Sequence, residues 1–65
     1  MQKDIEINFY HYIDFDNMHV IEMEIINHKN NTTYWKLYKS NTRKKVVAIA
    51  KAQETRILNR FYGGK

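Results

Sequence analysis

Residues 4–15, with the sequence DIEINFYHYIDF, alternate between two kinds of side chain with a period of two. The odd positions are mostly aliphatic or phenylalanine, whereas the even positions are polar or tyrosine. Successive side chains of a β-strand point to opposite faces, so this period predicts a strand with one buried face. The remaining segments are expected to pair with this strand or to pack against it.

A short loop at Phe15-Asp16-Asn17 is expected to return the chain in a hairpin, with Asn17 in the left-handed conformation that asparagine tolerates. The register then sorts the two strands into two faces. One face gathers mostly apolar side chains, namely Ile5, Ile7, Phe9, Ile13, His19, Ile21, Met23 and Ile25. The other face carries tyrosines, glutamates and two aliphatic residues, namely Glu6, Tyr10, Tyr12, Val20, Glu22, Glu24 and Ile26.

A third strand is expected over residues 32–39, after a polar turn at residues 28–31. This segment is rich in the β-branched and aromatic residues that favour strands. Alternation predicts that Trp35 and Leu37 point into the core. The side chains expected to point outward are Tyr34, Lys36 and Tyr38.

One long helix is expected over residues 43–62, because this segment contains no glycine or proline before Gly63 and Gly64. Residues 40–42, Ser-Asn-Thr, supply helix-capping side chains. The apolar residues gather on the side expected to face the sheet, namely Val46, Val47, Ile49, Ala50, Ile57, Leu58 and Phe61. The sequence therefore predicts a single α+β domain over residues 1–65, in which a three-stranded antiparallel sheet precedes one amphipathic helix packed on one sheet face.

Composition places the chain among small globular proteins. It has 65 residues, 43% of them hydrophobic and 28% charged, and no cysteine, so neither a disulfide nor a thiolate metal site is available to stabilise it. No apolar run approaches the roughly 18 residues that span a bilayer, and the first residues do not resemble a signal peptide. We therefore expect a cytoplasmic protein that does not bind membranes.

Charge is divided unevenly along the chain. Residues 1–28 contain six acidic and one basic side chain, a net charge of −5, whereas residues 29–65 contain ten basic side chains and Glu54, a net charge of +9. Such asymmetry creates a field that steers anionic partners. Arg43, Lys44 and Lys45 fall in the first helical turn, where the helix dipole disfavours cations by up to about 1 kcal/mol each.

The basic cluster suggests binding of the phosphate backbone of DNA or RNA, because free N–H groups at a helix N-terminus also attract phosphate. The residues predicted to bind nucleic acid are Arg43, Lys44, Lys45, Lys51, Arg56 and Lys36. The alternative is an ordinary solvated surface, or ion pairs of these cations with Asp14, Glu22 or Glu24. The first function that we expect is therefore a non-catalytic nucleic-acid-binding accessory or regulatory protein.

The sheet face away from the helix suggests a second function. It is expected to expose an aromatic and aliphatic patch made of Tyr10, Tyr12, Tyr34, Tyr38, Val20 and Ile26. Exposed patches of this kind usually bind nucleobases, a second copy of the chain or a different protein, and the glutamates on this face favour protein. The alternative function is thus a small modulator or inhibitor, of the kind that phages and mobile elements encode, acting on a larger host protein. The alternative to a binding patch is that tyrosine simply favours strands. We also expect a homodimer.

Enzymatic and metal-binding functions are not expected. His11, His19 and His28 show no metal-ligand spacing, and only the first two share a predicted sheet face. The chain has no cysteine nucleophile and no glycine-rich phosphate loop, and Ser40 is explained as a capping residue. We therefore assign no catalytic residue, no metal and no cofactor.

In architecture alone, three strands followed by one helix resemble the small DNA-reading domains that precede the catalytic cores of phage and transposon recombinases. The resemblance implies that the open sheet face enters a DNA groove. Here that face is expected to carry Glu6, Glu22 and Glu24, which repel phosphate, so no site residues are carried over.

Overall fold

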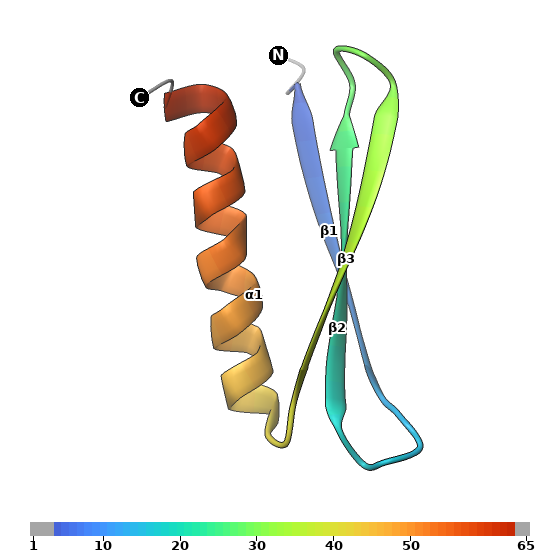
Figure 1. Cartoon of the computed structure of the whole chain (residues 1–65). Helices are drawn as coiled ribbons and strands as arrows, with labels where there is room; N and C mark the ends of the chain where they lie inside the picture. Colours follow the sequence, from blue (N-terminus) through green and yellow to red (C-terminus); the bar gives the residue numbers. More distant parts are fainter. Residues whose placement is uncertain (1–3, 64–65) are drawn as a thin grey trace.

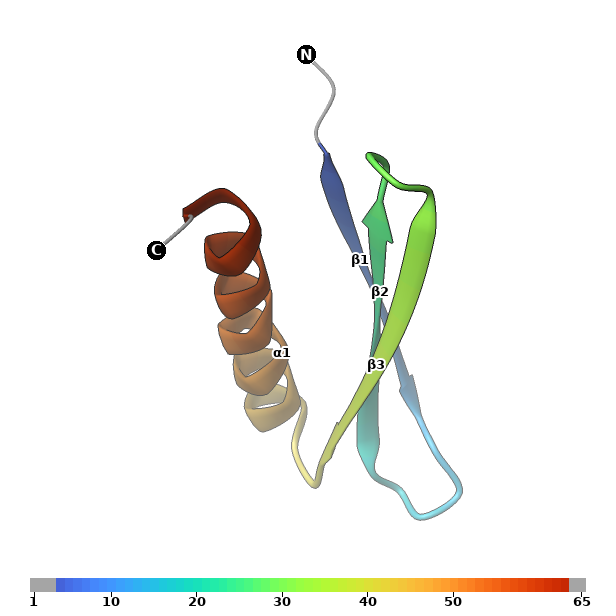
Figure 2. The ribbon, with the colours of Figure 1, turned by 45° about the horizontal axis from the view of Figure 1, so that its top comes forward.

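Three antiparallel strands and one helix make up the protein, as the sequence predicts. The computed structural model describes residues 4–63, so Gly64 of the predicted helix stop lies outside the described residues. The sheet has the order β1-β2-β3, and the helix runs along one of its faces while the other face stays open (Figures 1 and 2). The elements are β1 (Ile5–Ile13), β2 (His19–Asn27), β3 (Thr32–Ser40), α1 (Arg43–Leu58) and η1 (Asn59–Gly63), a final wide π-helical turn.

The β1–β2 hairpin has the predicted register. Phe9 pairs with Met23 and Tyr12 pairs with Val20, which places the odd positions of both strands on one face. Asn17 adopts the predicted left-handed conformation, with φ of 62°. The Asp14 carboxylate fixes the loop by accepting hydrogen bonds from the backbone N–H groups of Asp16 at 2.9 Å and Met18 at 3.0 Å.

The predicted facing of β3 is wrong. Tyr38 pairs with Ile21 and Lys36 pairs with Met23, so Tyr34, Lys36 and Tyr38 lie on the helix-facing side of the sheet. Trp35 and Leu37 lie on the open side instead. Both the odd and the even positions of β3 carry large apolar or aromatic side chains, so composition does not decide which of the two faces is buried. The β2–β3 turn decides it, because a shift of one residue exchanges the two faces.

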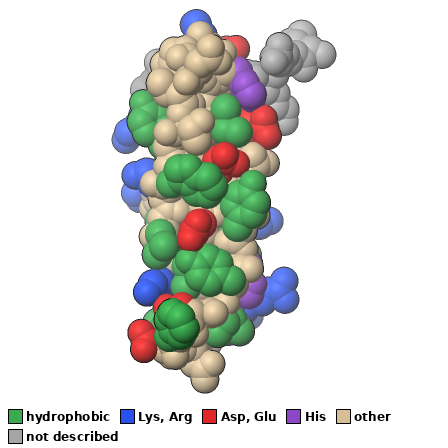
Figure 3. All heavy atoms as spheres, turned by 90° about the vertical axis from the view of Figure 1, so that its right-hand side faces the viewer, with side chains coloured by type: hydrophobic (Ala, Val, Ile, Leu, Met, Phe, Trp, Pro, Cys, Tyr) green, Lys and Arg blue, Asp and Glu red, His purple; other side chains and the backbone are tan. Residues whose placement is uncertain are grey.

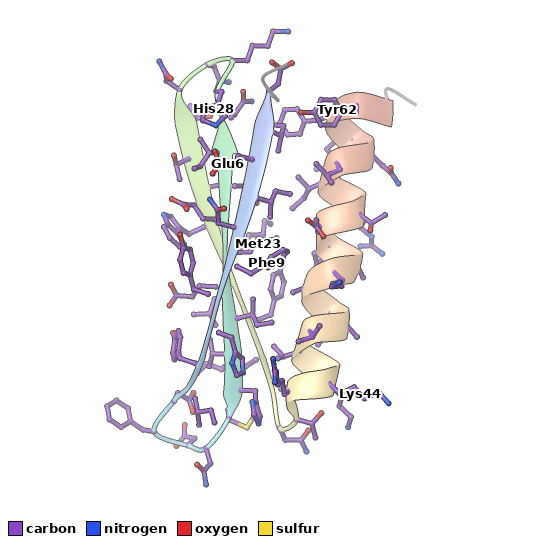
Figure 4. The ribbon with its side chains drawn as sticks, turned by 180° about the vertical axis from the view of Figure 1, so that it is seen from behind. Glu6, Phe9, Met23, His28, Lys44 and Tyr62 are labelled. Carbon is purple, nitrogen blue, oxygen red and sulfur yellow. The ribbon has the colours of Figure 1, made fainter. Side chains whose placement is uncertain are left out.

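The core lies between β2 and α1. Its fully or nearly buried side chains are Ile5, Ile21, Met23, Ile25, Val46 and Ala50, and Tyr38 packs against the clusters at both ends of this interface. Met23 and Phe9 point from the sheet toward the helix (Figure 4). Leu58 and Ile57 extend the core on the helical side, as the helical period predicts.

Both ends of the helix are held by polar contacts. Thr42 is the N-cap, and its Oγ1 accepts a hydrogen bond from the Lys45 N–H at 3.2 Å. At the other end, the Tyr62 hydroxyl accepts a hydrogen bond of 2.8 Å from the Ile5 backbone N–H, which ties η1 to the start of β1 (Figure 4). No helix in residues 4–63 is long and apolar enough to cross a membrane.

Candidate functional site

The glutamates of the sheet and the cations of α1 lie on opposite sides of the sheet. Glu6, Glu22 and Glu24 occupy even positions of β1 and β2, so they point to the outer face, which we define as the sheet face away from α1. Figure 3 views the molecule from its sheet side, and acidic and hydrophobic side chains alternate there. The cations of α1 belong to the other layer, so the acidic residues of the sheet do not shield them.

The first-turn cluster, Arg43, Lys44 and Lys45, is solvent-exposed as predicted. Lys44 points outward at the base of the helix (Figure 4). The Lys45 N–H already donates a hydrogen bond to the Thr42 side chain. A phosphate bound at this helix end would therefore accept hydrogen bonds from the N–H groups of Arg43 and Lys44. Within residues 4–63 the cations of α1 form no salt bridge, and Asp14 pairs instead with Lys39 at 3.0 Å.

A groove between β3 and the second half of α1 brings together two of the predicted nucleic-acid-binding residues. Lys36 from β3 and Arg56 from α1 both line it, whereas the predicted outward position would have separated Lys36 from the helix. The groove has a volume of about 510 Å³. Its walls are formed by Ile25, Tyr34, Trp35, Lys36, Gln53, Arg56, Ile57, Arg60 and Phe61, which include three cations and no carboxylate.

The outer face is aromatic as well as acidic. The rings of Tyr10 and Trp35 have centroids 5.9 Å apart, and Trp35 is 55% exposed. Tyr12 donates a hydrogen bond of 2.6 Å to Glu22, and Tyr10 donates one of 3.2 Å to Glu24. The negative charge of Glu24 raises the pKa of Tyr10, and the hydrogen bond to Glu22 raises the pKa of Tyr12, so both phenols stay protonated at neutral pH.

The predicted protein-binding patch requires correction at three positions. Tyr34 and Tyr38 lie on the helix-facing side, because they pair with Ile25 and Ile21 of β2, which face the helix. Val20 points to the outer face but has no exposed surface, so a partner protein cannot contact its side chain. Tyr10 and Tyr12 are exposed there, whereas Ile26 is half-buried and pairs with Glu6, several residues along β2 from the partners of the two tyrosines.

His11 and His19 share a sheet face, as predicted, and their rings stack with centroids 5.3 Å apart. The His11 Nε2 and His19 Nδ1 atoms are 3.1 Å apart, which fits a hydrogen bond in which one ring nitrogen donates and the other accepts. His28 lies near the β2–β3 turn and contacts Glu6 at 2.9 Å. Among the described residues, no three histidine or acidic side chains gather in a way that would hold a metal ion.

Sequence reasoning missed four residues of these surfaces. Arg60 lies one helical turn after Arg56, a spacing that would have indicated a shared flank. Phe61 was assigned to the core, yet it is 47% exposed and lines the groove. Trp35 and Leu37 were also assigned to the core, and no pattern within β3 distinguishes them from Tyr34 and Tyr38.

Comparison with known proteins found no matching family model, no matching curated protein and no matching solved structure. The resemblance to recombinase DNA-reading domains therefore rests on the order of elements alone.

Proposed function

We propose that the protein is a non-catalytic accessory protein that binds nucleic acid. The basic residues of α1 and the neighbouring Lys36 would contact the phosphate backbone. The observation that carries the proposal is the separation of charge. The basic residues of α1 lie across the sheet from Glu6, Glu22 and Glu24, and within the described chain they form no ion pairs. Cations without carboxylate partners release counterions when they meet phosphates, which drives association.

The cations lie along more than one line of the helix. Lys45 and Arg56 are eleven residues apart, about three helical turns, so both lie on the flank that borders β3. Lys44 and Lys51 lie seven residues apart, about two turns, and both are solvent-exposed. This spread supports contact with a flexible or curved backbone along two sides of the helix.

The proposal predicts a steep dependence of affinity on salt. Five phosphate contacts, one for each cation of α1, would give a slope of about −4.5 for the logarithm of duplex affinity against the logarithm of salt concentration. Replacing Lys44 and Lys45 by alanine should flatten this slope by about 1.8, because two contacts are lost. Fluorescence anisotropy of labelled DNA at several salt concentrations measures both quantities.

Lys29→Ala is the matched control, because it removes a cation from the β2–β3 turn, away from the helix, and should leave the slope unchanged. Circular dichroism should show that all variants remain folded, since these side chains are exposed. An absence of binding at about 50 mM salt, for duplex and single strands alike, would exclude the nucleic-acid function.

A second candidate function is the binding of a cationic protein by the outer face. Tyr10, Tyr12 and Trp35 expose aromatic surface next to Glu22 and Glu24, and aromatic rings flanked by carboxylates suit arginine and lysine side chains. Trp35 is the only tryptophan, and because it lies on this face but also lines the groove, a variant of this face is needed to assign a change in its fluorescence. An arginine-rich peptide should change this fluorescence in the wild type and much less in Glu24→Gln. No change at about 1 mM peptide would exclude this function.

A further inference from the structure

The groove between β3 and α1 offers more than phosphate contacts. Its volume of about 510 Å³ lies in the range of small-ligand sites, which is roughly 300–1,000 Å³. Ile25 and Ile57 contribute apolar lining, and Ile25 is a buried core residue, so this part of the groove is held by the packed interior. An apolar lining adds nothing to phosphate binding, but it suits the flat surface of a base.

Three exposed aromatic residues line the groove, namely Trp35, whose side chain lies on the outer face, and Tyr34 and Phe61. Tyr34 of β3 is 55% exposed and Phe61 of η1 is 47% exposed. Exposed aromatic rings are the usual platforms on which unpaired bases stack. Because Tyr34 and Phe61 come from different elements, the base would lie between the two layers of the fold.

Cations surround these rings. Lys36, Arg56 and Arg60 all line the groove, and in the described part of the chain none of them pairs with a carboxylate. Glu54 is the one acidic residue of the helix, and it does not line the groove. The groove is thus complementary to an anion that also carries an aromatic ring.

The helical wall of the groove is anchored. The hydrogen bond between the Ile5 N–H and the Tyr62 hydroxyl holds η1 against β1, and Leu58 packs into the core cluster of Ile5 and Met23. Arg60 and Phe61 lie between these two anchored positions. The groove therefore needs little rearrangement to accept a ligand, which lowers the entropic cost of binding.

We propose that this groove seats an unpaired nucleobase of a single-stranded nucleic acid, with Tyr34 and Phe61 against the base and Lys36, Arg56 and Arg60 on the adjoining phosphates. This inference rests on the proposed nucleic-acid function and narrows its ligand to single strands. In a duplex both faces of every base are covered by its neighbours, so a paired base has no free face to offer to the rings.

The test compares labelled single-stranded oligothymidine, oligouridine and a DNA duplex by fluorescence anisotropy. The wild type should bind the single strands more tightly than the duplex. Tyr34→Ala should weaken single-strand binding by about fivefold to a hundredfold, because it removes one stacking platform, and should leave duplex binding unchanged. Tyr34→Phe should restore the affinity. Comparison of oligouridine with oligodeoxyuridine, which has the same base, shows whether the 2′-hydroxyl of RNA contributes.

A matched pair of variants separates the groove from general charge. Arg56→Gln with Arg60→Gln should reduce single-strand affinity more than Lys44→Gln with Lys51→Gln, although each pair removes two charges. Equal losses from the two pairs, or an unaltered affinity in Tyr34→Ala, would overturn the groove inference while leaving the nucleic-acid function in place. Failure of the wild type to bind any of these probes would instead remove the function itself.

Discussion

Tyr38 shows how one side chain serves both ends of the core. It packs against the cluster of Ile5, Met23 and Ile25 and against the cluster of Ile21, Val46 and Ala50. Its hydroxyl oxygen is buried and has no hydrogen-bond partner among the described residues, and burial raises the pKa of the phenol. The ring therefore stabilises the interface between sheet and helix, whereas the hydroxyl group opposes its own burial.

Tyr38→Phe should stabilise the protein. The substitution keeps the ring and removes an unpaired buried hydroxyl, so the free energy of unfolding should rise by about 1 kcal/mol. Urea unfolding followed by circular dichroism measures the change. Tyr34→Phe is the control. Because the Tyr34 side chain is exposed, removing its hydroxyl group should change the free energy of unfolding little. A decrease of about 1 kcal/mol in Tyr38→Phe would show that the hydroxyl is hydrogen-bonded after all.

At the scale of elements, charged side chains reinforce both ends of the sheet. At one end Asp14 closes the β1–β2 loop through two backbone N–H groups and contacts Lys39 of β3 at 3.0 Å. At the other end Glu6 of β1 meets His28 of the β2–β3 turn at 2.9 Å (Figure 4). Hydrogen bonds from Lys39 and from the loop lower the pKa of Asp14, and those from His28 and Asn8 lower the pKa of Glu6.

These shifts predict a loss of stability in acid. A carboxyl group whose pKa is lower in the folded state binds protons more readily when unfolded, so its contribution is present above the ordinary pKa. The ordinary values are 3.8 for Asp14 and 4.5 for Glu6, and the contribution disappears as the pH falls below them toward the lowered folded values. Urea midpoints measured across this range should fall with pH, and Asp14→Asn should make the fall shallower. The lower end of the measurement is about pH 3, which is roughly one unit below the ordinary pKa values of carboxyl groups. A urea midpoint that stays constant between neutral pH and this value would contradict the lowered pKa values of Asp14 and Glu6.

The whole molecule is elongated and two-sided. Its extents are 38 × 23 × 17 Å, and its radius of gyration of 13.1 Å exceeds the value of about 11 Å expected for a compact chain of this length. One helix covers one face of a three-stranded sheet, so the aromatic rings and Leu37 on the other face remain exposed (Figure 3). A chain of 65 residues buries only about 60% of its unfolded surface, which makes further burial by a partner favourable.

We expect the outer face to form a weak homodimer. Sedimentation should show species larger than the monomer at concentrations on the order of tens of micromolar. A symmetric contact through this face brings Glu22 and Glu24 close to their copies, so added salt should strengthen the dimer by screening the repulsion. Leu37→Lys, which changes an exposed residue of this face, should weaken it. A monomer at about 1 mM under high salt would contradict homodimerisation.

The sequence by itself determined the elements and the hairpin. The period of two in residues 4–15, the left-handed Asn17 and the uninterrupted helical segment are local signals, and each acts over a few residues. These local signals also predict the order of the elements, which is three strands followed by one helix. The same signals placed the acidic residues of β1 and β2 on one sheet face, because the register of a tight hairpin is set by its own loop.

Only the tertiary structure decided the two faces of β3, and with them the candidate site. Tyr34, Trp35, Leu37 and Tyr38 are all suited to burial, so the choice depends on pairing with β2 and on the position of the helix. The observed pairing places Trp35 on the outer face, and Lys36 lines the groove together with Arg56. The groove joins residues about twenty positions apart, and such a contact has no local signature, because the pairing across the sheet and the packing of the helix create it.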